Sequence, residues 1–248
     1  MREHRIYGHR GAALRAPENT LAGLRSAHEL GATAVEVDVQ LTRDGVCVLI
    51  HDFAVERTTS GEGPVPAHDL TALKTLDAGG KFHEDYAGEE IPTLVEALGL
   101  LAELGLHVNL EIKPYPGREE QTARALFAEL AAHWPEDREP PLVSSFQRAS
   151  LAVAQAAAPD MPRALIASRG RAATWLRDAR ALDCVALHTS HKRVTPRLVR
   201  RVHDAGLLLG VFTVNEAALA TRLGALGVDY LFTDAPDVVG PAFLEARG

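Results

Sequence analysis

Cysteine is scarce in this chain, and its scarcity excludes one class of protein. The 248 residues include two cysteines, Cys47 and Cys184, each among apolar neighbours. Two isolated thiols do not build a disulfide framework, so we expect two buried, reduced side chains. A chain of this length buries a substantial core without such cross-links.

Long hydrophobic runs are missing as well. No segment approaches the roughly 18 uninterrupted apolar residues of a membrane span. Residues 1–12 carry positive charge but lack the apolar stretch that a secretory signal needs. These absences predict a cytoplasmic protein without stable membrane association.

Positive charge is in deficit. Lysine and arginine total 26 against 33 acidic residues, which gives a formal net charge of −7. A nucleic-acid-binding protein needs a basic stripe to neutralise phosphates, so the composition predicts no nucleic-acid partner. The one basic cluster, at residues 191–201, follows a helical pattern, and we interpret it as a solvated helix face.

What the chain does contain is a regular alternation of strand-like and helix-like segments. Amphipathic helical patterns cover segments such as 19–31, 93–105, 119–134 and 216–227. Strand patterns cover residues 5–9, 33–41, 46–52, 107–113, 141–146, 163–168, 184–190, 207–215 and 229–234. Repeated strand–helix units imply a parallel sheet covered by helices, and about eight units fit a (β/α)8 TIM-type barrel. The alternative, a doubly wound open sheet, lacks a Gly-rich phosphate turn after the first strand.

Turn residues mark the ends of these helices. Glycines follow four of the helical patterns and are expected at the C′ position, namely Gly31, Gly105, Gly206 and Gly227. Asp234, which precedes Ala-Pro, is expected to cap the last helix. Residues 53–90 break the rhythm, because they are rich in glycine and polar residues and contain only a short helical piece near 68–76. We therefore expect one domain over residues 1–248, with 53–90 as a functional insertion or lid.

Two strand patterns carry carboxylates on one face. In AVEVDVQL (34–41) the valines alternate with Glu36 and Asp38, and Glu111 occupies a similar position in HVNLEIK (107–113). Residues two apart on a strand project the same way, roughly 6.6 Å apart. In a barrel the three carboxylates would converge inside, where oxygen ligands suit Mg²⁺ or Ca²⁺ better than Zn²⁺. A solvated strand face, or a structural salt bridge between Glu111 and Lys113, remains the alternative.

Histidines end two of the strand patterns. His9 and His51 lie where barrel enzymes place catalytic groups, and two imidazoles can serve as general acid and base. His188 ends another strand and is a weaker candidate. Arg10 offers a forked, permanent charge for a phosphate or carboxylate, and Lys113 offers a second cation. With a metal this set favours phosphoryl transfer, and no G-x-S-x-G, P-loop or H-E-x-x-H motif competes with it.

These residues stand in a pattern that resembles the glycerophosphodiester phosphodiesterase family, of the bacterial cytoplasmic type, over nearly the whole chain. Many short motifs in a fixed order make the resemblance specific. They are GHRG (8–11), PENT (17–20), EVDVQLTRDG (36–45), HD (51–52), RTTSGEG (57–63), IPTL (91–94), EIK (111–113), the phenylalanine of SSF (146), FTVN (212–215) and TDAP (233–236).

The resemblance implies a TIM-type barrel with a small insertion, which matches residues 53–90. It also implies roles at the matching positions: a divalent metal, Mg²⁺ or Ca²⁺, at Glu36, Asp38 and Glu111, an acid–base pair at His9 and His51, phosphate binding at Arg10 and Lys113, and an alcohol-side pocket at Phe146 and Phe212. Many relatives have tryptophan at the position of Phe212, so the shape of that pocket is expected to differ. For Glu18 two roles are left open: support of the site from behind the residues that contact the substrate, or a purely structural role.

The reaction implied is cleavage of a glycerophosphodiester to sn-glycerol 3-phosphate and an alcohol. The glycerol 2-hydroxyl would attack phosphorus while one histidine accepts its proton and the other protonates the leaving alcohol, and water would then open the cyclic phosphate. One alternative is a phosphodiesterase directed at lysophospholipids, which calls for a basic amphipathic surface that the sequence does not display. The other is a non-catalytic barrel that binds phosphate ligands, which has no need of two histidines at strand ends.

Overall fold

Eight parallel strands close into a barrel within residues 6–247, the part of the chain that the structure, a computed structural model, describes. The barrel strands are β1 (Ile6–His9), β2 (Ala34–Leu41), β4 (His107–Ile112), β5 (Leu142–Ser145), β6 (Arg163–Ile166), β7 (Ala186–Ser190), β8 (Leu208–Phe212) and β9 (Tyr230–Thr233). The ring closes because β1 pairs with both β2 and β9, with Tyr7 opposite Ala34 on one side and Phe232 on the other. The predicted TIM-type barrel is confirmed.

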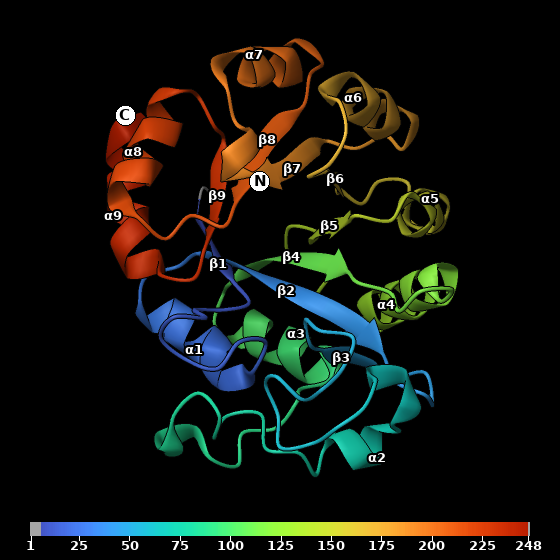
Figure 1. Ribbon diagram of the computed structural model, residues 1–248. Helices are drawn as coiled ribbons and strands as arrows, with labels where there is room; N and C mark the ends of the chain where they lie inside the picture. Colours follow the sequence, from blue (N-terminus) through green and yellow to red (C-terminus); the bar gives the residue numbers. More distant parts are fainter. Residues whose placement is uncertain (1–5, 248) are drawn as a thin grey trace.

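Helices surround the ring (Figure 1). They are α1 (Leu21–Glu29), α3 (Leu94–Glu103), α4 (Glu119–His133), α5 (Arg148–Ala157), α6 (Ala172–Ala181), α7 (Pro196–Asp204), α8 (Ala217–Ala225) and α9 (Pro236–Arg247). The glycines predicted at C′ positions follow α1, α3, α7 and α8, and all four have a positive φ, between 69° and 92°. Glycine reaches this left-handed conformation without the steric cost of a Cβ atom.

The two faces of β2 have different surroundings, as its alternating sequence predicts. Val35, Val37 and Val39 are fully buried in the apolar layer between the sheet and the helices. Inside the barrel, Tyr7, Tyr230 and other residues near the strand beginnings form a separate apolar cluster. This cluster fills the N-terminal end of the barrel, so an open site is left at the C-terminal ends of the strands.

The strand pattern at 46–52 belongs to a strand outside the ring of eight. This strand, β3 (Cys47–Leu49), runs antiparallel to β2, with Leu49 opposite Val39. The amide of Ile50 then donates to the carbonyl of Asp38 at 3.1 Å, so the chain returns along β2 toward the point where β1 ends. The sequence pattern had indicated that His51 ends a barrel strand. Instead, His51 enters the barrel mouth from a returning strand.

Residues 53–90 lie outside the barrel, beside β3 (Figure 1). They contain two 3-10 turns, η1 (Val65–Ala67) and η2 (Glu84–Tyr86), and the short helix α2 (Leu70–Leu73), which falls within the helical piece predicted near 68–76. Apolar side chains of this segment, such as Val55, Val65 and Leu73, form a small core with Val48 of β3 and with Ile50, which follows it. The segment is thereby fixed to the strand that delivers His51.

The remaining expectations concern cysteines and membranes. Cys47 and Cys184 are buried and unpaired, as predicted. Among residues 6–247 no helix is both long enough and apolar enough to cross a membrane.

Candidate functional site

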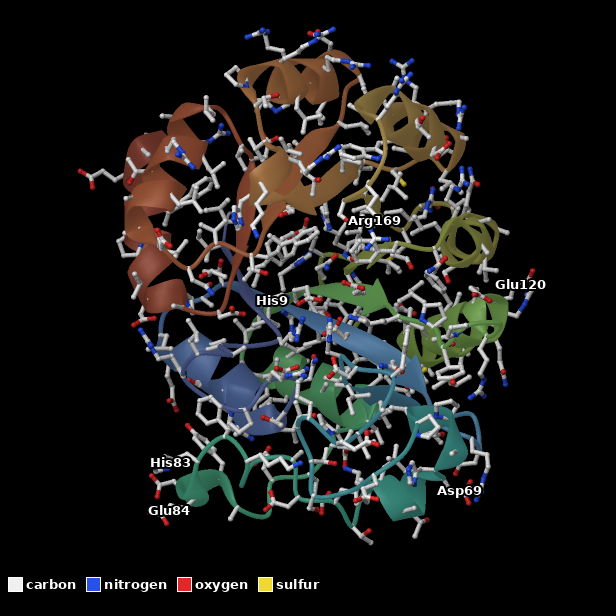
Figure 2. All side chains as sticks on the ribbon, viewed as in Figure 1. His9, Asp69, His83, Glu84, Glu120 and Arg169 are labelled. Atoms are coloured by element: carbon white, nitrogen blue, oxygen red, sulfur yellow. The ribbon has the colours of Figure 1, made fainter. Side chains whose placement is uncertain are left out.

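A cavity of about 140 Å³ opens at the C-terminal ends of the barrel strands. In Figure 2, His9 lies near the middle of the molecule, at the end of β1. All nine residues that the sequence predicts for the site line this one cavity. The lining consists of His9, Arg10, Glu36, Asp38, His51, Asn109, Glu111, Lys113, Phe146, Ile166, His188, Phe212, Thr213 and Phe232.

Three carboxylates meet in the cavity. Glu36 and Asp38 project inward from β2, and Glu111 lies opposite Asp38 on the neighbouring strand β4. Each residue offers one oxygen, and these atoms all lie within 4.8 Å of one another. Glu36 and Asp38 are only 4% and 1% exposed, so these acids are inside the barrel and not on a solvated face.

The electrostatics of this cluster are unbalanced. Burial raises the pKa of Glu36 well above its usual range, and the charges of Asp38 and Glu111 raise it further. Burial, with the charge of Asp38, also raises the pKa of Glu111 to about 8. The pKa of Asp38 is held low because Lys113 and Arg10 outweigh the effect of its burial. Two of the three carboxyl groups therefore lack sufficient positive charge nearby, and this oxygen-only donor set fits a hard divalent cation.

Asp38 has the most partners of the three acids. The side-chain amide of Asn19 donates to Asp38 Oδ2 at 2.9 Å, and its carbonyl oxygen accepts from the Asp38 backbone amide at 3.1 Å. Lys113 Nζ lies 3.3 Å from Asp38 Oδ1, and Arg10 Nε lies 3.3 Å from Asp38 Oδ2. Asn19 belongs to the PENT motif, but the sequence indicated no role for it. Only the folded chain brings it to β2.

His9 is held by a carboxylate from the far end of the chain. Its Nδ1 lies 2.6 Å from Asp234 Oδ1, and Asp234 Oδ2 accepts from Asn215 Nδ2 at 2.7 Å. An ionised carboxylate can only accept, so His9 donates from Nδ1 and its Nε2 is left as the cavity-facing atom, 3.9 Å from Glu36 Oε2.

The prediction that Asp234 caps the last helix is wrong. Helix α9 begins at Pro236, and the amides of Val238 and Val239 donate to the carbonyl of Ala235, which therefore precedes the helix as its boundary residue. The Asp234 side chain turns to the barrel mouth instead. The Asp-Ala-Pro sequence is compatible with both arrangements, and closure of the barrel between β1 and β9 decides between them.

His51 is held in the same way by its neighbour in sequence. Its Nδ1 lies 2.6 Å from Asp52 Oδ1, so Asp52 contacts Nδ1 and leaves Nε2 available to the cavity. Asp52 also pairs with Arg57, whose hydrogen bonds, together with those from His51, bring the pKa of Asp52 down to about 2. Gln40 Nε2 lies within 3.0 Å of the carbonyl oxygens of residues 50, 51 and 52, and so fixes the turn that carries the imidazole.

Glu18 connects this support to Arg10. Its carboxylate accepts from Arg10 Nη1 at 2.9 Å and from Arg57 at 2.7 and 2.8 Å. It does not line the cavity. Glu18 is therefore a positioning residue that orients two arginines, and Arg57, which sequence reasoning missed, is its second partner.

The opposite wall of the cavity is apolar. Phe146 follows β5 and Phe212 ends β8, and their rings meet edge to face with centroids 6.3 Å apart. His188 lines the same cavity and is buried, with its Nε2 2.7 Å from the Tyr230 hydroxyl. Burial lowers the pKa of His188 to about 3, so its ring is neutral at physiological pH. This wall therefore contributes shape without charge.

Comparisons with known proteins point to one family of phosphodiesterases. The model of the glycerophosphoryl diester phosphodiesterase family matches residues 9–238. A glycerophosphodiester phosphodiesterase of Caldanaerobacter subterraneus subsp. tengcongensis is 38% identical over 238 residues, which cover 94% of this chain and 95% of that protein. A phosphodiesterase of Oleispira antarctica, solved in complex with the product sn-glycerol-3-phosphate, is 38% identical with a TM-score of 0.93, and the match covers 96% of each chain. A glycerophosphodiester phosphodiesterase structure from Agrobacterium tumefaciens is 28% identical with a TM-score of 0.79, covering 96% of this chain and 99% of that one.

Proposed function

The chain belongs to the glycerophosphoryl diester phosphodiesterase family, and from this premise we propose that it hydrolyses glycerophosphodiesters to sn-glycerol 3-phosphate and an alcohol with a divalent metal and the His9–His51 pair. The observation that carries the proposal is the meeting of two carboxylate-held imidazoles and three carboxylates in one cavity. The product bound by the Oleispira antarctica relative supports the choice of product. We further infer that residues 1–248 act as one catalytic domain, with 53–90 as an insertion.

Glu36, Asp38 and Glu111 would hold the metal, for which Mg²⁺ and Ca²⁺ are the ions that suit their oxygen ligands. When bound, a divalent cation supplies positive charge that eases ionisation of a substrate hydroxyl and stabilises charge on phosphoryl oxygens. The excess negative charge of the cluster supports this assignment, because buried carboxylates without counter-charge are costly.

Arg10 and Lys113 would bind the phosphate. Both lie within 3.3 Å of Asp38, so their positively charged ends are already gathered at the carboxylate cluster. Arg10 is further restrained by Glu18, and its backbone amide donates to Glu36 Oε2 at 3.1 Å. A cation held in place before the substrate arrives needs little reorganisation when charge develops on the phosphoryl group.

His9 and His51 would move the protons. One Nε2 accepts the proton of the glycerol 2-hydroxyl as its oxygen bonds to phosphorus, and the other histidine donates a proton to the departing alcohol oxygen. In the second stage the roles reverse, and water opens the cyclic phosphate to leave sn-glycerol 3-phosphate. Asp234 and Asp52 hold the Nδ1 protons and so keep Nε2 of each ring available for these transfers.

A product assay tests the proposal. Glycerophosphocholine, glycerophosphoethanolamine and lysophosphatidylcholine are each incubated with Mg²⁺, with Ca²⁺ or with a chelator. We expect sn-glycerol 3-phosphate and free choline from glycerophosphocholine in the presence of metal, no product with chelator, and recovery when metal is restored. The proposal would be contradicted by release of phosphocholine, by turnover that the chelator does not reduce, or by a preference for the lysolipid. A preference for the lysolipid would favour the lysophospholipid-directed alternative.

A further inference from the structure

A second and larger hollow lies between α6 and α7. Its volume is about 570 Å³, and its walls come from two segments, the start of α6 and the stretch that runs from η3 (His191–Arg193) into α7. Five cationic side chains line it: Arg171, Lys192, Arg193, Arg197 and Arg201. We call this hollow the basic groove. Many nitrogen-tipped side chains surround α6 and α7 in Figure 2.

The charge of the basic groove is uncompensated. No acidic residue lines it, and within residues 6–247 none of its five cations forms an ion pair with a carboxylate. By contrast, Arg10 and Arg57 in the catalytic region are each paired with acids. In a chain with a net charge of −7, such a concentration of unpaired cations makes a local positive field that favours an anion.

The start of α6 adds to this field. Arg171 is the N-cap residue of α6 and makes no side-chain capping bond, and α6 has no acidic residue in its first turn. The start of α7 is already capped, because Thr195 Oγ1 accepts from the amide of Leu198 at 3.1 Å. The N-terminal amides of a helix are partial positive charges that bind phosphate oxygens when no side chain satisfies them.

One arginine of the groove is held in place. Arg193 Nη2 donates to the carbonyl of Gly170 at 2.8 Å, and its guanidinium lies 5.3 Å from the ring centroid of Trp175. Trp175 is itself anchored, because its Nε1 donates to the carbonyl of Arg169 at 2.6 Å. Arg193 is therefore oriented before any ligand arrives, and its other N–H groups remain available.

We propose that the basic groove binds a phosphate-bearing anion, at a site separate from the cavity of His9 and His51. Four of its five cations are arginines, whose forked N–H groups match phosphate oxygens, and the uncapped start of α6 supplies further donors. The loops after β6 and β7 form the groove, while Ile166 and His188 of those strands line the catalytic cavity. Both sites therefore lie at the same end of the barrel. The cluster at 191–201 is thus a binding surface built with Arg171, and not only a solvated helix face.

Trp175 provides a direct readout, because the chain contains only one other tryptophan, Trp134. In a Trp134→Phe background, tripolyphosphate is titrated without divalent metal, and the fluorescence of Trp175 is followed. We expect a saturable change. The double variant Arg197→Gln/Arg201→Gln should bind about tenfold more weakly, since an exposed charge pair contributes up to about 1 kcal/mol and 1.4 kcal/mol is tenfold.

Arg200→Gln is the matched control, because Arg200 lies on α7 but does not line the groove. It should change the affinity less than about twofold. Hydrolysis of glycerophosphocholine should be unchanged in the double variant, which also shows that the variant is folded. An absent fluorescence change, or equal affinity in the double variant and its parent, would overturn the proposal.

Vesicles distinguish a lipid headgroup from a free phosphate compound. Binding to phosphatidylglycerol vesicles but not to phosphatidylcholine vesicles identifies a lipid phosphate as the ligand, and binding of tripolyphosphate without either vesicle identifies a free anion. Both results support the site, provided the double variant loses them. Equal binding to both kinds of vesicle would contradict it, because the neutral choline headgroup offers no net charge to the cations.

Discussion

The two halves of the cavity that contains His9 and His51 are built in opposite ways. The half formed by β1, β2 and β4 carries charge, with His9 at the end of one strand and carboxylates on the other two. The half formed by β5 to β9 presents Phe146, Ile166, Phe212 and a neutral His188. This difference supports a division of labour in which the charged half holds the glycerol phosphate and the apolar half faces the departing alcohol.

The two halves also differ in what supports them. Several charged residues of the first half are held by hydrogen bonds from other segments, such as Asp234 with His9 and Asn19 with Asp38, because a buried polar group without a hydrogen bond is costly. The apolar half needs no such partners, since ring contacts and burial are enough. Changes in the charged half are therefore expected to abolish activity, and changes in the apolar half to adjust it.

The carboxylates should give the largest effect. Glu36→Gln, Asp38→Asn and Glu111→Gln should each lower kcat/KM by about 10³-fold or more, because each removes negative charge from the proposed metal site. Metal affinity, measured by calorimetry, should fall in parallel, while circular dichroism should show an intact fold.

Glu103→Gln is the control for these variants, since Glu103 is 67% exposed on α3 and should leave both measurements unchanged. Parent-like metal binding and turnover in all three carboxylate variants would mean that the charged half of the cavity is structural.

The histidines come next. His9→Ala and His51→Ala should each lower the rate by at least about 10²-fold, the lower end of what a positioned acid or base contributes, and the parent should show a bell-shaped dependence on pH. A p-nitrophenyl diester, whose leaving group needs little protonation, should partly rescue one variant and not the other. The rescued variant identifies the residue that protonates the alcohol. Equal losses of both variants on both substrates would show that neither imidazole is the leaving-group acid.

Much of the difference between the two halves of the cavity could be predicted from the sequence, because polar residues are easily recognised in strands that are otherwise apolar. The alternation of valines with Glu36 and Asp38 predicted which face of β2 points inward, and burial of both faces follows from the barrel. The direction of β3 could not be predicted, since a short apolar run reads the same in a parallel or an antiparallel strand.

Contacts between distant segments were also beyond the sequence. His9 and Asp234 are separated by 225 positions and meet only because β1 closes against β9. The basic groove joins Arg171 to a cluster on another helix because β6 and β7 pair side by side in the barrel. Local patterns report faces and ends of elements, while partners across the barrel depend on its closure.

The acids behind the histidines should have intermediate effects. Asp234→Asn and Asp52→Asn should lower kcat by about tenfold, less than removal of an imidazole, because each leaves the ring present but weakens control of its tautomer. Proton NMR should show loss of the downfield Nδ1–H signal of the affected ring. Asp237→Asn is a matched control, since Asp237 is close to Asp234 in sequence but pairs with Arg15. A full loss of activity equal to that of the His→Ala variants would show that the acids take part in the chemistry themselves.

The aromatic wall should give the smallest effect, and one that depends on the alcohol. Phe146 is 44% exposed at the mouth and meets Phe212 edge to face, so the two rings form a surface that a departing group can contact. The trimethylammonium group of choline interacts with aromatic rings by about 0.5–1 kcal/mol at exposed sites, whereas a glycerol headgroup has no cation to offer. Phe146→Ala and Phe212→Ala should therefore reduce the preference for glycerophosphocholine over glycerophosphoglycerol by about two- to fivefold, with the change in KM and not in kcat. Phe212→Trp should keep or increase that preference, because the ring is larger, and Phe82→Ala, at an exposed phenylalanine outside the cavity, should leave it unchanged. An equal loss on both substrates would instead assign the two rings to packing of the barrel mouth, and selection of the alcohol would then have to come from the charged half.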